Sequence, residues 1–395
     1  MATNIHEDFL QLLRIGIGTG TVKGLQLTVI GSKSLMEIKD LADAHGLSAV
    51  VLDGIEKTPK LGDTLPLEQK LEWIGEVLQN YEQRYSAYEK AIRDLAGFYN
   101  QHGFKMMVIK GYGLSWNYPK PSHRPCGDID VWLFGQQREA DAALGSWFKV
   151  HGSNQKVDTS HHHHTVFEWE GFTVENHYDF MNVHYGHRSK ELEKIFKELG
   201  DASHINDNDN NQELENSRIS STSKNANGTK IPSVEVKGEN VYLPSANLHA
   251  LFLLRHSLQD FAAAVLTLRQ VLDWALFVEK HTKEIDWVWL TGIIKEYKMT
   301  DFFNCLNAIC VGDLGFDVKI FPNVQFDPFL KEKVLDDIIS PAYKRQSPRG
   351  FLKGMIYKYR RWQGNAWKQE LCYNESRWEM FWSGMWNHLL KPKTL

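Results

Sequence analysis

Two aspartates lead directly into an apolar run at residues 127–134, Gly-Asp-Ile-Asp-Val-Trp-Leu-Phe. The run predicts a β-strand. Side chains two positions apart on a strand lie on one face, so Asp128 and Asp130 are expected to point together. Carboxylates held this close repel each other unless a cation compensates them, which favours a chemical role. For this pattern taken alone, the alternative is a turn residue at Asp128 followed by a solvated Asp130.

Residues 172–178 show the same alternation, which places Thr173, Glu175 and His177 on one face of a second expected strand. If the two strands are neighbours, Glu175 lies beside the two aspartates. Three convergent carboxylates make a hard oxygen site for Mg²⁺ or Mn²⁺. Two such ions, about 3.5 to 4 Å apart, activate an attacking oxygen and stabilise the leaving oxygen during displacement at phosphorus.

The segment around the aspartates resembles a known family. Residues 108–133 carry a Lys-Gly turn at Lys110, a Tyr-Pro pair at Tyr118, Arg124, and then Gly-Asp-Ile-Asp. This combination is similar to the core of the uncharacterised bacterial nucleotidyltransferase family, within the DNA polymerase β-type nucleotidyltransferase superfamily. The resemblance covers most of residues 5–290 and continues through these further pieces: Glu175, Leu243-Pro244, His249, His256 and residues 268–274.

The resemblance implies a function and assigns roles within it. We expect a metal-dependent enzyme that transfers a nucleoside monophosphate from a nucleoside triphosphate to a hydroxyl acceptor, with release of pyrophosphate. Asp128, Asp130 and Glu175 would be the catalytic metal ligands, and Glu175 or Asp130 would also take the hydroxyl proton. The acceptor and the base of the nucleotide are not specified by any spacing in the sequence.

The expected nucleotide contacts depart from the superfamily pattern at one point. The usual Gly-Ser at the start of the preceding helix is replaced by Lys110-Gly111, 17 positions before Asp128. A lysine and the amides of a helix N-terminus both bind phosphate, so Lys110 and Gly111 are expected to hold the triphosphate. The alternative is a strand-to-helix turn that needs glycine. His177 and Arg124 are further nucleotide-binding candidates, and Arg124 is as well suited to fixing its loop.

Two other functions remain open at this point. One is a catalytically inactive nucleotide-sensing or partner-binding module, which the missing serine favours and the intact aspartate pair disfavours. The other is a metal-dependent phosphohydrolase, in which water is the acceptor.

The expected fold is α+β, a small mixed β-sheet nucleotidyltransferase core flanked by N-terminal and C-terminal helical regions. Apolar residues at a spacing of three or four predict one long helix, or two in register, over 66–102. We expect a helical region at 1–102, the core at 103–200 and a further helical, aromatic-rich region at 231–395. Residues 201–230, rich in Asn, Asp and Ser, are expected to form a mobile polar insertion.

Two further segments carry sequence expectations. Glu170-Gly171 predicts a tight turn that joins the strand of Glu175 to a preceding strand. If that preceding strand includes His161–His164, the four imidazoles alternate between its faces, which disfavours a four-histidine metal site and favours structural hydrogen bonds. Residues 234–242 are expected to add an edge strand. On a later helix, Arg269 and Asp273 fall four apart, which suits a surface ion pair. The family resemblance implies that His256, Arg269 and Asp273 shape substrate binding, and core packing with ion pairing is the alternative.

The composition excludes several classes. Lys and Arg number 45 against 49 Asp and Glu, a net charge of -4, so no broad basic surface for extended nucleic acid is expected. The four cysteines show no Cys-x-x-Cys spacing, the first residues lack a signal sequence, and no apolar run reaches membrane-spanning length. We therefore expect a cytoplasmic protein of undetermined oligomeric state.

An amphipathic helical stripe is expected near the C-terminus. It predicts a core-facing helix, or a membrane-surface or partner-binding face, and contains Trp378, Phe381, Trp382, Met385, Trp386 and Leu389.

Overall fold

The computed structural model of the 395-residue chain divides into two compact units. It describes residues 5–21, 31–181, 187–201, 219–224, 230–263, 265–322, 325–343 and 350–373. Within these ranges, the helical unit contains residues 5–84, 115–125 and 253–373. The sheet unit contains residues 85–114 and 126–252.

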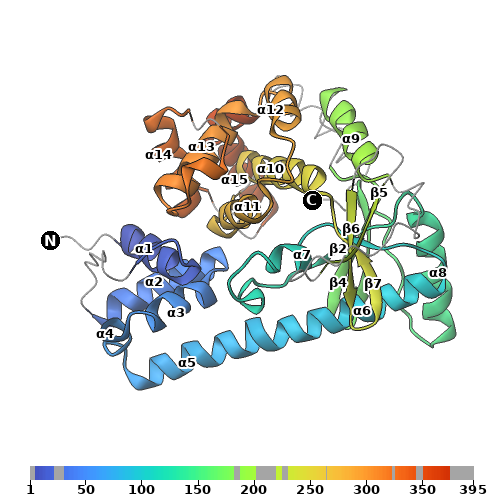
Figure 1. Cartoon of the computed structure of the whole chain (residues 1–395), viewed down its shortest axis with the longest axis horizontal. Coiled ribbons are helices and arrows are strands. Elements are labelled where there is room, and N and C mark those ends of the chain that lie inside the picture. Colours follow the sequence, from blue (N-terminus) through green and yellow to red (C-terminus); the bar gives the residue numbers. More distant parts are fainter. Residues whose placement is uncertain are drawn as a thin grey trace. The chain divides into compact units, whose positions relative to one another are not determined.

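The sheet unit is built on seven strands in the order β3-β4-β2-β1-β7-β6-β5. The strands are β1 (Met107–Val108), β2 (Ile129–Trp132), β3 (His164–Trp169), β4 (Phe172–His177), β5 (Ile219–Lys224), β6 (Lys230–Val236) and β7 (Glu239–Tyr242). The pairs β2–β4 and β1–β7 are parallel and the other four are antiparallel. A mixed sheet with flanking helices confirms the expected α+β class (Figure 1).

The register between β2 and β4 positions the candidate site. Asp130 pairs with Glu175, and Trp132 pairs with His177. Paired residues of adjacent strands point to the same face of a sheet, so these side chains share one face. The expected adjacency of the two strands is confirmed.

A tight turn joins β3 to β4, as predicted. Glu170 and Gly171 both have positive φ, 49° and 80°. Positive φ at both central residues is typical of the type I′ turn, whose twist matches that of a two-residue hairpin. The hairpin brings His164 opposite His177.

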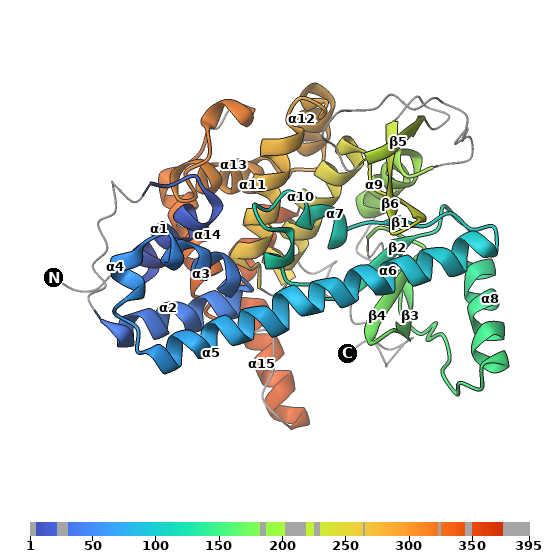
Figure 2. The ribbon, with the colours of Figure 1, turned by 60° about the horizontal axis from the view of Figure 1, so that its bottom comes forward.

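The face of the sheet that points away from Asp130 packs against α6 (Arg84–Gln101) and α8 (Gln137–Val150). Tyr88 of α6 meets Phe172 edge to face with ring centroids 5.2 Å apart, and the Tyr99 hydroxyl hydrogen-bonds to Asn176. Asn176 also donates to Asp141 of α8, at 2.8 Å. Figures 1 and 2 show α6 running beside the strands in both views. The opposite face therefore remains for the site.

The site face is partly covered by aromatic packing from α9 (His187–Leu199). The rings of Trp132 and Phe180 lie 4.3 Å apart, and Phe180 stacks on Phe196 of this helix. The indole of Trp132 donates to the Gly200 carbonyl at 3.1 Å. Glu193 accepts from the backbone amides that follow β4, which fixes the chain beyond His177.

One nearly continuous helix links the segments of the two units. It consists of α5 (Leu67–Val77), a π-helical turn η2 (Leu78–Gln83) and α6, and Gly103 with a φ of 79° follows its end. The predicted long helix over 66–102 is therefore confirmed. Helix α10 (Ala246–Ala263) likewise begins in the sheet unit and ends in the helical unit.

The helical unit contains short helices that pack closely. Its other elements are α1 (Ile5–Ile17), α2 (Ser32–His45), α3 (Ser48–Glu56), α4 (Pro59–Gly62), η3 (Pro121–His123), α11 (Leu268–His281), α12 (Trp287–Glu296), α13 (Thr300–Gly312), η5 (Val318–Ile320), α14 (Pro328–Ile339), α15 (Phe351–Gly364) and α16 (Ala366–Cys372). Glycines allow α1 and α3 to touch: a Cβ at Gly54 would lie 2.2 Å from the Leu12 carbonyl oxygen. Trp274 of α11 donates to Asn307 of α13 in the core.

The structure changes some sequence expectations and leaves others untouched. Residues 234–242 are not one edge strand: they contain the end of β6 and all of β7, and β7 lies inside the sheet beside β1. Within the polar segment 201–230, residues 219–224 form β5, while residues 202–218 and 225–229 lie outside the described residues. The aromatic stripe at 378–389 also lies outside them. Over the described ranges, no helix is long and apolar enough to cross a membrane.

Candidate active site

Asp130 is the most deeply buried carboxylate of the site. It lies on β2 with 1% of its surface exposed. Its Oδ1 atom is 2.9 Å from Nζ of Lys110 and 3.3 Å from Nε2 of His177. Its Oδ2 atom is buried and has no hydrogen-bond partner among the residues that the structure describes. A buried carboxylate oxygen left without a partner is costly, and a bound cation would satisfy it.

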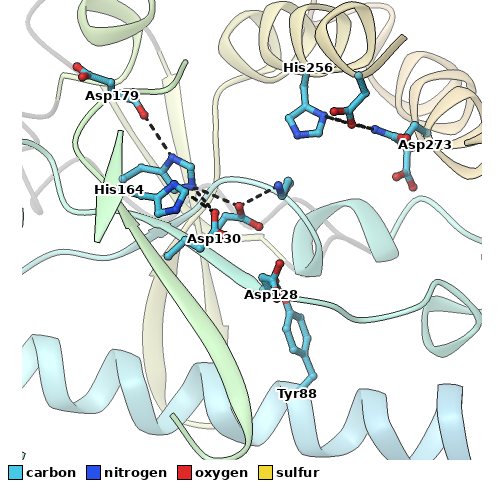
Figure 3. Close-up of polar contacts among 12 residues, drawn as sticks. Tyr88, Asp128, Asp130, His164, Asp179, His256 and Asp273 are labelled. Atoms are coloured by element: carbon cyan, nitrogen blue, oxygen red, sulfur yellow. Dashed lines mark hydrogen bonds and ion pairs between the residues drawn. The ribbon is translucent and has the colours of Figure 1, made fainter. Parts of the chain in front are cut away.

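His177 bridges the two carboxylates on the same face. Its Nε2 atom lies 3.3 Å from Asp130 and 3.4 Å from Oε2 of Glu175. Its Nδ1 atom faces the Asp179 carbonyl oxygen at 3.3 Å (Figure 3). The sequence suggested that His177 contacts the nucleotide or acceptor, whereas its polar partners in the structure include the two carboxylates and the Asp179 carbonyl.

The electrostatics of these groups are strongly perturbed. Burial alone would lower the pKa of His177, but Asp130 and Glu175 raise it to about 9. Burial would raise the pKa of Asp130, yet Lys110 and His177 hold it well below its usual range. Burial would likewise raise the pKa of Glu175, but the hydrogen bond from His177 and the charges of His164 and His177 together lower it. Without a metal ion, two cationic side chains therefore balance the carboxylates.

Asp128 stands just before β2 with its side chain exposed. Its backbone carbonyl accepts a hydrogen bond from the Tyr88 hydroxyl at 3.0 Å, which ties this point of the chain to α6 (Figure 3). Desolvation, together with the charges of Glu175 and Asp130, raises the pKa of the Asp128 carboxyl. Tyr88 was not identified from the sequence, because one tyrosine among many apolar positions of a long helix carries no signal.

The Lys110-Gly111 turn follows β1 and carries Lys110 to Asp130. Gly111 has a φ of 78°, and a Cβ there would lie 2.6 Å from the Tyr88 hydroxyl. The position therefore requires glycine both for backbone conformation and for space. The helix that follows, α7 (Tyr112–Ser115), is a single turn, and the Tyr112 amide already donates to the Lys110 carbonyl. The lysine side chain, rather than a row of amides, is thus the better candidate for the expected phosphate contact.

The histidine run does not form the alternating strand expected from the sequence. Strand β3 begins only at His164, so the alternation predicted over 161–164 is wrong. The rings of His163 and His164 lie 4.2 Å apart, and both lie near His177, at 5.5 and 5.2 Å between centroids. The histidine run itself was visible in the sequence, but the sequence did not show that the strand begins only at the fourth histidine.

Arg124 lies in the helical unit and is held by a carboxylate. Its Nε and Nη2 atoms donate to the two oxygens of Asp273 at 2.8 and 3.0 Å, and both residues are buried. The Tyr118 hydroxyl donates to Asp273 as well, at 2.8 Å. Arg269 approaches the same carboxylate at 3.5 Å. Asp273 is therefore a buried carboxylate with several partners rather than half of a surface ion pair. Its contacts with Arg124 support the loop-fixing role of Arg124.

The residues of the site suit a divalent cation. Asp130, Glu175 and His177 each offer one ligand atom, and these atoms all lie within 4.8 Å of one another. The unpartnered Oδ2 of Asp130 adds a free oxygen donor, and carboxylate oxygens are the ligands that Mg²⁺ and Mn²⁺ prefer. The exposed carboxylate of Asp128 is available at the edge of the same cluster.

A model of the family described as uncharacterised nucleotidyltransferase matches residues 34–214 and 216–311. The chain belongs to this family. Comparisons with curated proteins and with solved structures gave no match.

Proposed function

We propose that this protein is a metal-dependent nucleotidyltransferase that transfers a nucleoside monophosphate from a nucleoside triphosphate to a hydroxyl acceptor. The observation that carries the proposal is the pairing of Asp130 with Glu175 across β2 and β4, beside Lys110, in a chain of a nucleotidyltransferase family. Asp128, Asp130 and Glu175 are the proposed ligands of Mg²⁺ or Mn²⁺. When bound, the ion neutralises phosphate charge and polarises the attacked phosphorus.

Each side chain has a separate task in this proposal. Lys110 has three donor hydrogens, so it can keep its contact with Asp130 and also bind a phosphate oxygen. Glu175 has 22% of its side chain exposed, against 2% for Asp130. An acceptor hydroxyl therefore reaches Glu175 more easily, and Glu175 is the better candidate to take the hydroxyl proton. His177 orients both carboxylates.

Catalysis of this kind depends on positioning and charge rather than on a covalent intermediate. The transferred group carries negative charge on its equatorial oxygens, which fixed cationic groups stabilise more strongly in a partly dehydrated site. The buried Asp130 holds Lys110 in place before any substrate binds. Its fixed position reduces the reorganisation needed during transfer.

A transfer assay tests the proposal. The protein is incubated with Mg²⁺, each of the four nucleoside triphosphates labelled at the α-phosphorus, and a mixture of small hydroxyl compounds. The proposal predicts a labelled adduct and equimolar pyrophosphate, reduced at least about 100-fold by Asp130→Asn or Glu175→Gln. Asp94→Asn, which removes a carboxylate of an ion pair on α6, is the matched control and retains activity.

Two results would contradict transfer. Steady formation of labelled nucleoside monophosphate with no added acceptor, and no adduct when acceptors are present, identifies a phosphohydrolase. Equal adduct formation by Asp130→Asn removes the assigned role of the carboxylate pair.

A further inference from the structure

Three imidazoles gather beside the carboxylates, at the junction of β3 and β4. His163, His164 and His177 each offer a ring nitrogen, and these nitrogens all lie within 4.8 Å of one another. We propose that these three histidines form a second metal site, for a transition-metal ion of the zinc class, which shares His177 with the carboxylate cluster. Neutral imidazole suits Zn²⁺ and related ions, whereas Mg²⁺ prefers oxygen ligands. Binding of the metal ion would therefore release the proton that Asp130 and Glu175 hold on His177.

The backbone holds the three rings in this arrangement. His163 precedes β3, and its carbonyl accepts from the amides of Tyr178 and Asp179 at 3.0 and 3.2 Å. His164 is the register partner of His177 in the β3–β4 hairpin. Adjacent histidines on a regular strand would point to opposite faces, so the break before β3 is what allows His163 and His164 to converge. The cluster is thus built by backbone contacts rather than by chance approach of mobile side chains.

Unpartnered nitrogens form the second line of evidence. Nδ1 of His163 and Nδ1 of His164 are both buried and have no hydrogen-bond partner within the described part of the chain. His164 is 7% exposed. Buried polar atoms without partners are rare because each one costs free energy. A metal ion bound by these nitrogens would remove that cost.

The remaining contacts supply the other features of a histidine-rich metal site. The Asp179 carbonyl lies 3.3 Å from Nδ1 of His177 and orients the ring, while Nε2 lies 3.3 Å from Asp130 and 3.4 Å from Glu175. Metal-binding histidines usually donate their second nitrogen to such a carbonyl or carboxylate. Oε2 of Glu175 lies 3.6 Å from Nδ1 of His164 and 3.4 Å from Nε2 of His177. Glu175 therefore lies against two of the three imidazoles, and the three nitrogens leave one position of four-coordinate Zn²⁺ for another ligand.

Titration with Co²⁺ tests the site directly, because four-coordinate Co²⁺ reports its ligands by its visible absorption. The protein is prepared without an added polyhistidine tag, which would itself bind the ion. Calorimetry with Zn²⁺ gives the number of ions bound per chain. We expect one ion per chain, with affinity reduced at least about tenfold in His163→Gln and further in His163→Gln/His164→Gln. His162→Gln, a change in the same run but outside the cluster, is the matched control and retains the affinity.

Two further measurements keep this inference separate from the proposed function. Asp128→Asn removes a proposed Mg²⁺ ligand but none of the nitrogens, so Co²⁺ binding persists even if nucleotide binding is lost. Circular dichroism checks that the variants are folded, and His163→Gln alone decides the question if the double variant unfolds. Unchanged affinity in folded His163→Gln, or an equal loss in His162→Gln, would overturn the proposed site. Absence of Co²⁺ and Zn²⁺ binding to the native protein would overturn it as well.

Discussion

A single buried carboxylate, Asp130, connects the stability of the site with its proposed chemistry. Its Oδ1 atom faces Lys110 and His177, and the residue has almost no exposure to solvent. Taking such charges out of water is costly, and the cost is recovered only when the partners are well placed. The sequence predicted Asp130 and Glu175 as neighbours, because strand alternation fixes which side chains share a face. It did not predict the cationic partners, because contacts of Lys110 and His177 across the sheet have no local signature.

Replacing Lys110 tests its role at the phosphates. Lys110→Gln removes the cation that faces both Asp130 and the proposed triphosphate, so we expect the Kd for the Mg²⁺-bound nucleoside triphosphate to rise at least about tenfold. Isothermal titration calorimetry measures this. Lys120→Gln is the control, because Lys120 also pairs with a carboxylate, that of Asp53 in the helical unit. Equal weakening by both variants would show that the loss is not specific to the site.

Replacing Arg124 separates a structural role from nucleotide binding. Arg124→Met leaves the buried Asp273 without its two-point partner, so we expect a loss of about 3 to 5 kcal/mol in the free energy of unfolding. Urea denaturation measures it. The double variant Arg124→Met/Asp273→Leu should recover part of the loss, and the exposed Arg138→Met should cost little. Unchanged stability with a large loss of nucleotide affinity would instead support nucleotide binding, the other role that the sequence left open for Arg124.

At the scale of the elements, prediction succeeded where periodicity decides the structure. The long helix ending before Gly103 and the β3–β4 hairpin at Glu170-Gly171 both followed from local pattern. The strand predicted for the histidine run was wrong. The backbone amides of Tyr178 and Asp179 donate to the His163 carbonyl, and His163 lies outside the strand. The length of one strand was also overestimated: the apolar run at 127–134 predicted a longer strand than β2, which contains four residues.

The contact of α1 with α3 depends on glycine. A Cβ at Gly54 would lie 2.2 Å from the Leu12 carbonyl oxygen, so Gly54→Ala must separate the two helices. We expect a loss of about 1 to 3 kcal/mol in the free energy of unfolding. Gly75→Ala on α5 is the matched control: nothing lies within 4 Å of its Cβ, and alanine there should stabilise the helix by about 0.5 to 1 kcal/mol. Thermal or urea denaturation that ranks the two variants equally would contradict this packing.

The loop at η3 carries a pH-dependent anchor. His123 lies between Asp53 and Glu82, at 2.8 and 3.0 Å, so both ring nitrogens face carboxylates. Burial alone would lower the pKa of His123, but the hydrogen bonds to Asp53 and Glu82 raise it. A raised histidine pKa contributes stability that is fully present below the ordinary value, about 6.5, and that is lost as pH rises through the folded value.

The variant His123→Gln tests this anchor. Near pH 5.5 we expect it to be less stable than the native protein by about 1.5 to 3 kcal/mol, the usual loss for a hydrogen bond to a charged group. The difference should shrink as the pH rises above the ordinary histidine value, because the native protein then loses the same interaction. Denaturation curves at several pH values measure it. A difference that stays constant with pH would contradict a protonated His123.

At the scale of the whole molecule, the two units are not consecutive segments. The helical unit combines residues from both halves of the chain, and Arg124 meets a partner 149 positions away. Helical and strand periods are local, so they do not reveal such interleaving. The family match covers both units, which indicates that the helices accompany the sheet as part of one family pattern. The sequence therefore predicted the sheet site more fully than the arrangement of the helical unit.

Calorimetry can test whether binding of a nucleoside triphosphate depends on the aspartate pair. Each of the four triphosphates, with Mg²⁺, is titrated into the native protein and into Asp128→Asn/Asp130→Asn. We predict that at least one triphosphate binds the native protein and that its binding is lost in the variant, while circular dichroism shows both proteins folded. Binding of equal strength to both proteins, or no binding of any triphosphate to the native protein, would contradict the proposed nucleotidyltransferase site.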